Sequence, residues 1–172
     1  SENSYRVRLL DIEYIDTENK RDTQRYGFVL ETTGELAKRI GGEKVDIHSI
    51  SLGMLNDHQE ALVYVFQYLI GNTDWSFVNE EEGQDCCHNG KLISKGNELL
   101  YIPYDFDLSG LVNANYAYPN AGMGISRVTQ RLYRGFCMDR NALSTAIDEI
   151  QAQETAFNDI IDQLPALSRS QK

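Results

Sequence analysis

Two aspartates, Asp105 and Asp107, stand two positions apart, shortly after the apolar residues 99–102. If the backbone stays extended through residue 108, side chains alternate between two faces, so both carboxylates lie on the same face. Two like charges at that spacing destabilise each other unless a positive charge lies nearby. Because Mg²⁺ prefers oxygen ligands, the spacing indicates a site for a divalent cation. The alternative is a pair of solvated acids at a strand end, with Asp107 capping the next turn.

Two more polar residues precede this pair. Asp74 follows a helical pattern that ends at Gly71, so it lies on a loop held by a rigid element, where a carboxylate can act as a general base for a hydroxyl nucleophile. Asn89 stands just before a strand-like segment and offers a neutral oxygen that can complete a metal shell without adding charge. Considered alone, each of these residues is also explained as an ordinary loop or turn residue with no catalytic role.

A helix and a hairpin must position these residues. Asn56 is a candidate N-cap with Gln59 three residues later, and the apolar residues that follow recur at helical spacing up to Gly71. That apolar set is Ala61, Leu62, Val65, Phe66, Leu69 and Ile70. Residues 91–94 and 99–102 read as a β-hairpin that turns at residues 95–97.

The first part of the chain predicts two strands and a short helix. Residues 5–14 and 26–30 are rich in β-branched and aromatic residues and read as an antiparallel hairpin. Thr33 is a candidate cap for a short helix over residues 34–40, which stops at two glycines. Residues 43–55 fit no single element.

The C-terminal part predicts helices. Residues 111–124 read as an irregular segment, and residues 125–137 as a helix with three arginines along one side. Asp139 is a candidate cap for a last helix, whose apolar stripe runs from residue 143 to residue 164 and ends at Pro165. The sequence therefore predicts an α+β fold.

The composition argues against two classes of function, nucleic-acid binding and membrane insertion. The 172 residues carry a net charge of −10, and the pI is about 4.7. An acidic surface repels phosphate backbones, which argues against nucleic-acid binding. No apolar run approaches the roughly 18 residues of a membrane span, so no membrane insertion is expected. The compartment stays open.

The cysteines give no clear signal. Cys86 and Cys87 are adjacent, Cys137 is far away and the count of three is odd, so no disulfide framework can be read from them. With His88, the adjacent pair contains the residue types of a zinc site. However, adjacent cysteines cannot easily face one metal ion and no second pair follows, so a plain loop is favoured over a zinc site.

The order of these features matches a known catalytic arrangement. A helix, an Asp on a loop, an Asn before a hairpin and an Asp at its far end follow one another as in the catalytic half of a protein kinase. Residues 72–75 (Asn-Thr-Asp-Trp), 88–89 (His-Asn) and 102–108 (Ile-Pro-Tyr-Asp-Phe-Asp-Leu) resemble the active-site segments of the spore-coat CotH family of atypical kinases. A looser similarity exists to HipA-type kinases. The Tyr-Gly-Phe-Val-Leu-Glu of residues 26–31 resembles the strand and glutamate beside that family's hinge.

The resemblance assigns a role to each candidate. It makes Asp74 the catalytic-loop acid, Asn89 and Asp105 metal ligands, and Asp107 a second ligand or a support. It places Glu31 at the nucleotide, and it implies ATP, Mg²⁺ or Mn²⁺, and a hydroxyl acceptor, for which a protein is favoured. The implied activity is phosphoryl transfer.

The implied fold is an α+β, atypical protein-kinase-like fold, with a partial N-lobe hairpin and a mostly helical C-lobe. Residues 1–42 would form the hairpin and a hinge-like segment, residues 43–167 the catalytic lobe with its inserted hairpin, and residues 168–172 a frayed tail.

The chain departs from the family in three places. Tyr104 stands where the family usually has Trp, and the loop between Asp74 and Asn89 is long, with an acidic run at residues 80–82. No Gly-rich phosphate loop and no strand lysine precede the hairpin, so these parts are expected in an upstream segment. Two alternatives therefore stay open: a kinase-like module that binds without catalysing, and a metal-dependent hydrolase built on Asp105 and Asp107.

Overall fold

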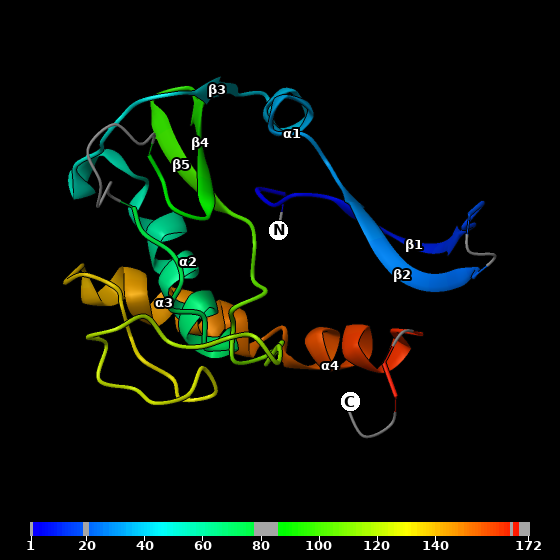
Figure 1. Ribbon diagram of the computed structural model, residues 1–172. Coiled ribbons are helices and arrows are strands. Elements are labelled where there is room, and N and C mark those ends of the chain that lie inside the picture. Colours follow the sequence, from blue (N-terminus) through cyan, green and yellow to red (C-terminus); the bar gives the residue numbers. More distant parts are fainter. Residues whose placement is uncertain (1, 19–20, 78–85, 166, 169–172) are drawn as a thin grey trace.

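The computed structural model describes residues 2–18, 21–77, 86–165 and 167–168. Within these residues the chain forms four α helices and two small antiparallel sheets (Figure 1). The predicted α+β class is therefore confirmed. The acidic run at residues 80–82 and most of the predicted tail lie outside the described residues. Among the described helices, none has the length and apolar character needed to cross a membrane.

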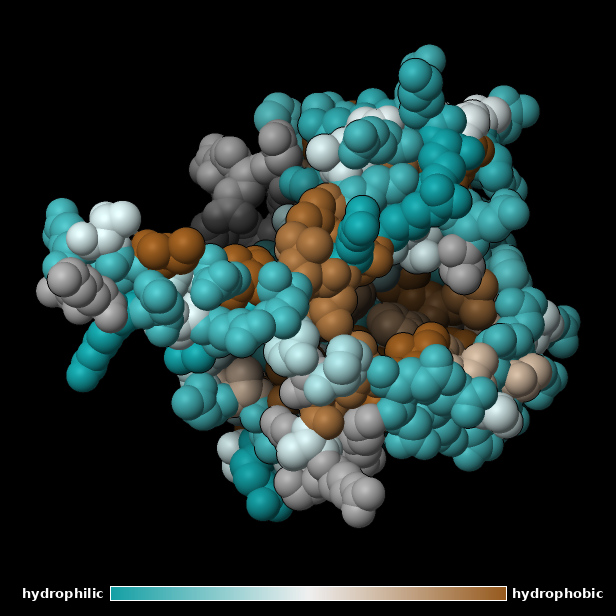
Figure 2. Space-filling model, turned by 90° about the vertical axis from the view of Figure 1, so that its right-hand side faces the viewer, coloured by the Kyte–Doolittle hydropathy of each residue, from teal (hydrophilic) through white to brown (hydrophobic). Residues whose placement is uncertain are grey.

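The first sheet is the predicted N-terminal hairpin. Strand β1 (Val7–Tyr14) pairs antiparallel with β2 (Thr23–Leu30), and Leu9 lies opposite Phe28. The hairpin projects away from the rest of the molecule (Figure 1). Figure 2, a view from the side on which it projects, shows hydrophobic residues gathered around a hollow near the centre of the face. Several hairpin side chains are exposed, including Phe28 at 67% and Val7 at 61%, although a two-stranded sheet is only marginally stable on its own.

The second sheet holds the predicted second hairpin. Strands β3 (Glu43–Val45), β4 (Gly90–Lys95) and β5 (Glu98–Pro103) lie in that order, all antiparallel. Residues 43–55, which no pattern assigned, supply β3 and the short 3-10 helix η1 (Leu52–Met54).

Helices cover both faces of this sheet. Because strand side chains alternate, Leu92 and Tyr101 join one apolar cluster with residues of helix α2 (Asp57–Ile70). Ile93, Leu100 and Ile102 join another with helix α1 (Thr33–Ile40). Thus α1, from the predicted N-terminal segment, packs on strands of the predicted catalytic lobe.

The ends of the two helices follow from their caps. The side chain of Thr32, rather than Thr33, accepts the N–H of Glu35 at 3.2 Å, so α1 begins one residue earlier than predicted. The side chain of Asn56 accepts the N–H of Gln59 at 2.9 Å, as predicted for the start of α2. Gly71 ends α2 in the left-handed conformation (φ 67°), which glycine adopts without steric cost.

The buried face of α2 differs from the predicted one. Tyr64 is only 1% exposed, whereas Leu69, a member of the predicted apolar stripe, is 40% exposed. The ring of Tyr64 lies among Trp75, Phe77 and Tyr133, with centroids 5.2 to 6.0 Å away. Aromatic packing with Trp75 and Phe77 of the following loop and with the distant Tyr133 therefore selects the buried face of α2. The periodicity of the helix itself cannot show this preference.

The prediction of a helix over residues 125–137 is wrong. These residues form turns and irregular backbone, and their side chains reach toward the end of α2. Arg131 donates to the carbonyl of Leu69 at 2.9 Å, and Arg134 donates to the carbonyl of Trp75 at 2.7 Å. Long-range bonds of this kind override a local helical spacing.

The last helix is divided into two. Asp139 caps α3 (Arg140–Gln151) as predicted, accepting the N–H groups of Asn141 and Ala142. The chain then leaves the helix, and α4 (Glu154–Gln163) begins after Gln153, which has φ −97° and ψ 5°. The apolar stripe has no large member between Ile150 and Phe157, so no packing holds one continuous helix there.

Candidate functional site

The loop that carries Asp74 is held from both sides. Directly after Gly71, the side-chain oxygen of Asn72 accepts the N–H of Asp74 at 2.9 Å. The indole N–H of Trp75 donates to the carbonyl of Asn72 at 3.1 Å. Asn72 and Trp75 are buried, whereas the side chain of Asp74 keeps 18% exposure. The loop therefore presents one partly accessible carboxylate from a fixed backbone.

Two consecutive residues, His88 and Asn89, contact this carboxylate. The side-chain amide of Asn89 donates to the carbonyl oxygen of Asp74 and to its Oδ2, both at 2.8 Å. Nε2 of His88 lies 3.0 Å from Oδ1 of Asp74. The structure thus brings together Asp74 and Asn89, two of the candidate site residues, and adds His88, which the prediction left without a role.

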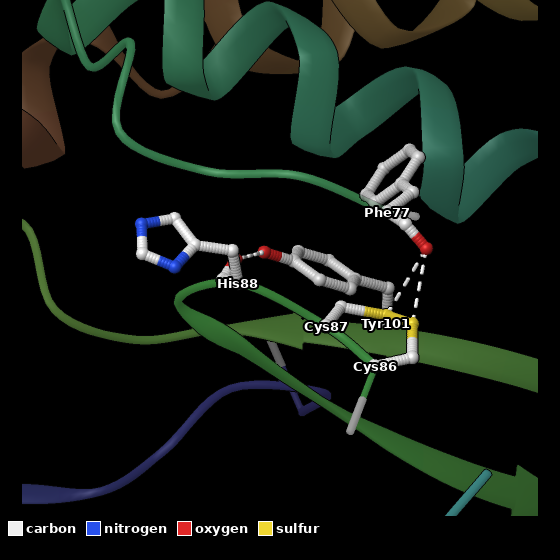
Figure 3. The surroundings of a disulfide bond; sticks show 5 residues. All are labelled: Phe77, Cys86, Cys87, His88 and Tyr101. Carbon is white, nitrogen blue, oxygen red and sulfur yellow. Dashed lines mark hydrogen bonds between the residues drawn. A yellow bond between two sulfur atoms is a disulfide. The ribbon is translucent and has the colours of Figure 1, made fainter. Parts of the chain in front are cut away.

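Residues of the second sheet fix the backbone of His88 and Asn89. The hydroxyl of Tyr101 donates to the carbonyl of His88 at 2.9 Å (Figure 3). A Cβ added at Gly90 would overlap the ring of Tyr101, so only glycine fits after Asn89. Asn89 itself has φ 52°, a left-handed conformation that Asn tolerates better than most residues.

A disulfide lies directly before these residues. Cys86 and Cys87 are bonded to each other and buried, with both sulfur atoms next to the carbonyl oxygen of Phe77 (Figure 3). The structure therefore shows a pairing that could not be read from the cysteine pattern. Adjacent cysteines pair only where the backbone brings their side chains together, which the sequence pattern does not reveal.

Asp105 reaches the same region through the backbone. The N–H of Tyr104 donates to the carbonyl of Asn89 at 3.0 Å, which places Asp105 next to the Asn89 segment. The strand does not continue through residue 108, because β5 ends at Pro103 and Asp105 has φ 61°. The argument from strand alternation is therefore wrong.

The carboxylates of Asp105 and Asp107 nevertheless meet. Burial raises the pKa of Asp105, and a side-chain hydrogen bond with Asp107 and the negative charges of Asp107 and Asp74 raise it further. The hydroxyl of Tyr116 donates to Asp107 at 3.1 Å, which raises the pKa of Tyr116. This is the like-charge pair that the sequence indicated, reached by a turn instead of a strand.

The metal prediction receives limited support from the donor set. Within the described part of the chain, no three or more His, Cys, Asp or Glu side chains gather as a metal-binding group. The predicted ligands are two carboxylates and an amide. Asn89 uses its amide nitrogen on Asp74, which leaves Oδ1 as its side-chain acceptor. The like-charge pair is a group that a cation would stabilise, and the metal-ligand roles of Asn89, Asp105 and Asp107 stay predictions.

Glu31 occupies a structural ion pair. Its two carboxylate oxygens accept from Arg39 at 2.8 Å each, and Oε2 also accepts the backbone N–H of Arg6 at 3.0 Å. The hydrogen bond with Arg39 is the main reason why the pKa of Glu31 falls to about 2. These bonds join the hairpin to α1. The nucleotide-contact role of Glu31 stays a prediction.

Arg134, one of the three arginines on the predicted helix, contacts the Asp74 loop through backbone carbonyls and not through the solvated salt bridges that the sequence favoured. Its guanidinium donates to the carbonyls of Thr73 and Trp75, on either side of Asp74, and lies 5.8 Å from the ring centroid of Trp75. These contacts span 61 and 59 positions. No local pattern signals a bond of that range.

Comparisons with protein-family models, curated proteins and solved structures find no match to this chain. The kinase-like form of the fold therefore stays a prediction, and the chemistry of the site must be argued from its own geometry.

Proposed function

We propose that this chain carries the catalytic part of a kinase-like phosphotransferase, which moves a phosphoryl group from ATP to a hydroxyl acceptor, with a protein as the favoured acceptor. The single observation that carries the proposal is the contact of Asn89 and His88 with Asp74. The carbonyl of Asn89 also accepts the N–H of Tyr104, which directly precedes Asp105. A base and a candidate metal-binding pair thus lie on neighbouring segments.

Asp74 would orient the acceptor hydroxyl and accept its proton. Asn89 donates one hydrogen bond to this carboxylate and one to the backbone carbonyl of Asp74, and Nε2 of His88 lies 3.0 Å from Oδ1, so the carboxylate is held in one orientation. The side chain is partly exposed, so an acceptor can reach it. Catalysis of phosphoryl transfer consists mainly of orienting the reactants and stabilising charge. A carboxylate held in a fixed position can supply the orientation.

Asp105, Asp107 and Oδ1 of Asn89 would hold Mg²⁺ or Mn²⁺. When bound, the ion would offset the charge of the transferring phosphoryl group. Mg²⁺ is commonly held by one or two carboxylates together with substrate phosphates. A two-carboxylate set therefore fits phosphotransfer better than it fits the hydrolase alternative, where the protein must supply most of the ligands.

The test compares Asp74→Asn with the wild-type chain. Transfer of labelled γ-phosphate from ATP should fall by on the order of 10²-fold or more, while Mg²⁺-dependent nucleotide binding stays intact. Asp159→Asn, an exposed position in α4, is the matched control and should keep the wild-type rate.

Wild-type transfer by Asp74→Asn would remove Asp74 from the mechanism. If the wild-type chain binds Mg²⁺ and nucleotide yet transfers nothing to hydroxyl acceptors, the alternative of a kinase-like binding module is supported instead.

A further inference from the structure

The disulfide between Cys86 and Cys87 is buried directly before the residues that contact Asp74. Both residues are buried, at 4% and 5% exposure, within the apolar cluster that includes Phe77 and Tyr101. Their sulfur atoms lie 3.0 and 3.2 Å from the carbonyl oxygen of Phe77 (Figure 3). The N–H of Cys86 donates to the carbonyl of Ile47 at 3.1 Å. The pair is therefore anchored to the core on several sides.

The chain runs from this pair directly into the site. His88 follows Cys87, and Asn89 follows His88; their side chains contact Asp74 while Tyr101 holds the carbonyl of His88. Only one peptide unit separates Cys87 from the first contact with Asp74, so a shift of the Cys87 backbone must displace His88.

We propose that the Cys86–Cys87 pair is a redox-responsive positioning element for the Asp74 site. The disulfide holds His88 and Asn89 on Asp74, and reduction to two thiols releases them. The geometric part of this proposal stands by itself, whereas its effect on phosphoryl transfer rests on the proposed function.

The reducing agent is a dithiol. Its thiolate attacks one cysteine sulfur, which breaks the Cys86–Cys87 bond and forms a mixed disulfide; its second thiolate then displaces that cysteine. The dithiol leaves as a cyclic disulfide, and its two electrons and two protons end on the two cysteine thiols.

Reduction forces a movement because bonded and non-bonded sulfur atoms need different space. Bonded sulfurs are about 2 Å apart, whereas non-bonded heavy atoms lie roughly 3.5 to 4 Å apart. A close-packed core cannot absorb that difference without a shift. The carbonyl of Phe77 lies within reach of both sulfurs, so both new S–H groups have an acceptor, and the reduced state buries no unpaired donor.

The decisive experiment is NMR of the histidine rings and the Asn89 side-chain amide at one fixed pH. Spectra are recorded for the oxidised chain, for the chain reduced with dithiothreitol, and after reoxidation, and mass spectrometry verifies the gain of two hydrogen atoms. His58 is a built-in control, because its Nε2 lies 2.8 Å from Glu149 of α3 and forms a second histidine–carboxylate pair outside the Asp74 contacts.

The expected result is that His88 and Asn89 signals move on reduction and return on reoxidation, while the His58 signals stay. Unchanged His88 signals in the reduced chain would overturn the proposal. A disulfide that dithiothreitol cannot reduce in the folded chain would overturn it too, as would an equal shift of His58, which indicates general loosening.

A variant separates this proposal from the proposed function. The Cys86→Ser/Cys87→Ser chain cannot form the bond, so its His88 signals should match those of the reduced wild type and its transfer rate should fall roughly tenfold or more. Cys137→Ser removes the exposed free cysteine and should change neither. If His88 responds but no variant transfers phosphate, the proposed function fails and this proposal stands. If the double variant does not fold, the wild-type comparison still decides.

Discussion

The side-chain amide of Asn89 bonds both the carboxylate and the backbone carbonyl of Asp74, at 2.8 Å each, across 15 positions of the chain. We predict that removing this amide lowers phosphoryl transfer roughly 10²-fold, because the carboxylate loses its orientation. Asn89→Gly and Asn89→Ala both remove it. At φ 52° glycine fits freely, whereas alanine is strained by about 1 kcal/mol or more.

The two variants should therefore share one low transfer rate but differ in unfolding free energy, with Asn89→Gly the more stable by about 1 kcal/mol. Chemical denaturation and a transfer assay measure both quantities. A Gly variant with wild-type activity would show that the amide is only structural.

The sequence located Asn89 and Asp74 on their elements better than it predicted their surroundings. Local signals placed both residues at the ends of correctly identified elements: a capped helix that stops at Gly71 and a hairpin that begins at Gly90. Once these elements pack, the two residues are neighbours. The meeting of Asp105 and Asp107 was expected for the wrong reason, since a turn rather than a strand produces it.

Other parts of the site depend on distant contacts. The bonds of Arg134 to the Asp74 loop come from residues 125–137, which the sequence pattern predicted as a helix. The bond between Cys86 and Cys87 depends on backbone geometry that residue types do not encode. In physical terms, tertiary packing decides these features, and a local pattern cannot anticipate it.

Asp105 should destabilise the fold at neutral pH. Its pKa is raised in the folded chain, so its contribution to stability is fully present below the ordinary pKa of about 3.8 and is lost as the pH rises through the folded value. Asp105→Asn should therefore raise the melting temperature at pH 7 and leave it nearly unchanged at pH 3. Thermal unfolding at both pH values measures the difference.

The effect of Mg²⁺ on stability provides a second test of the Asp105→Asn variant. If Asp105 is a metal ligand, added Mg²⁺ should stabilise the wild-type chain, and Asp105→Asn should lose most of that gain. The exposed Asp159→Asn serves as the control at each condition. Equal stabilisation of all three chains by Mg²⁺ would contradict the metal assignment.

The ion pair of Glu31 and Arg39 should make the chain acid-sensitive. Because the folded pKa of Glu31 is lowered from 4.5 to about 2, its stabilisation is present above pH 4.5 and is lost as the pH falls toward 2. Glu31→Gln should lower stability at pH 7 and show a weaker further loss between pH 4.5 and pH 2.

Glu154→Gln, an exposed position at the start of α4, is the control and should follow the wild-type pH profile. Unfolding midpoints in denaturant, measured across this pH range, give the comparison. If Glu31→Gln lost as much stability on acidification as the wild type, the ion pair would not be the source of the pH dependence.

Arg134 should support the Asp74 loop more than it supports the fold as a whole. Arg134→Ala leaves the carbonyls of Thr73 and Trp75, both in buried residues, without this donor. The expected loss is about 1 to 3 kcal/mol of unfolding free energy, together with reduced transfer, because these carbonyls flank Asp74. Arg134→Lys keeps a charged donor but not the planar fork, so it should fall between alanine and wild type.

Arg127→Ala tests whether the effect is specific to the loop. Arg127 is exposed and lies in the same irregular segment, residues 125–137, as Arg134. Its loss should change the unfolding free energy by no more than about 0.5 kcal/mol. Denaturant unfolding and transfer assays on the three variants give the ranking. If Arg127→Ala and Arg134→Ala lowered transfer equally, the arginines would act through overall charge, and the bonds of Arg134 to the Asp74 loop would not explain the loss.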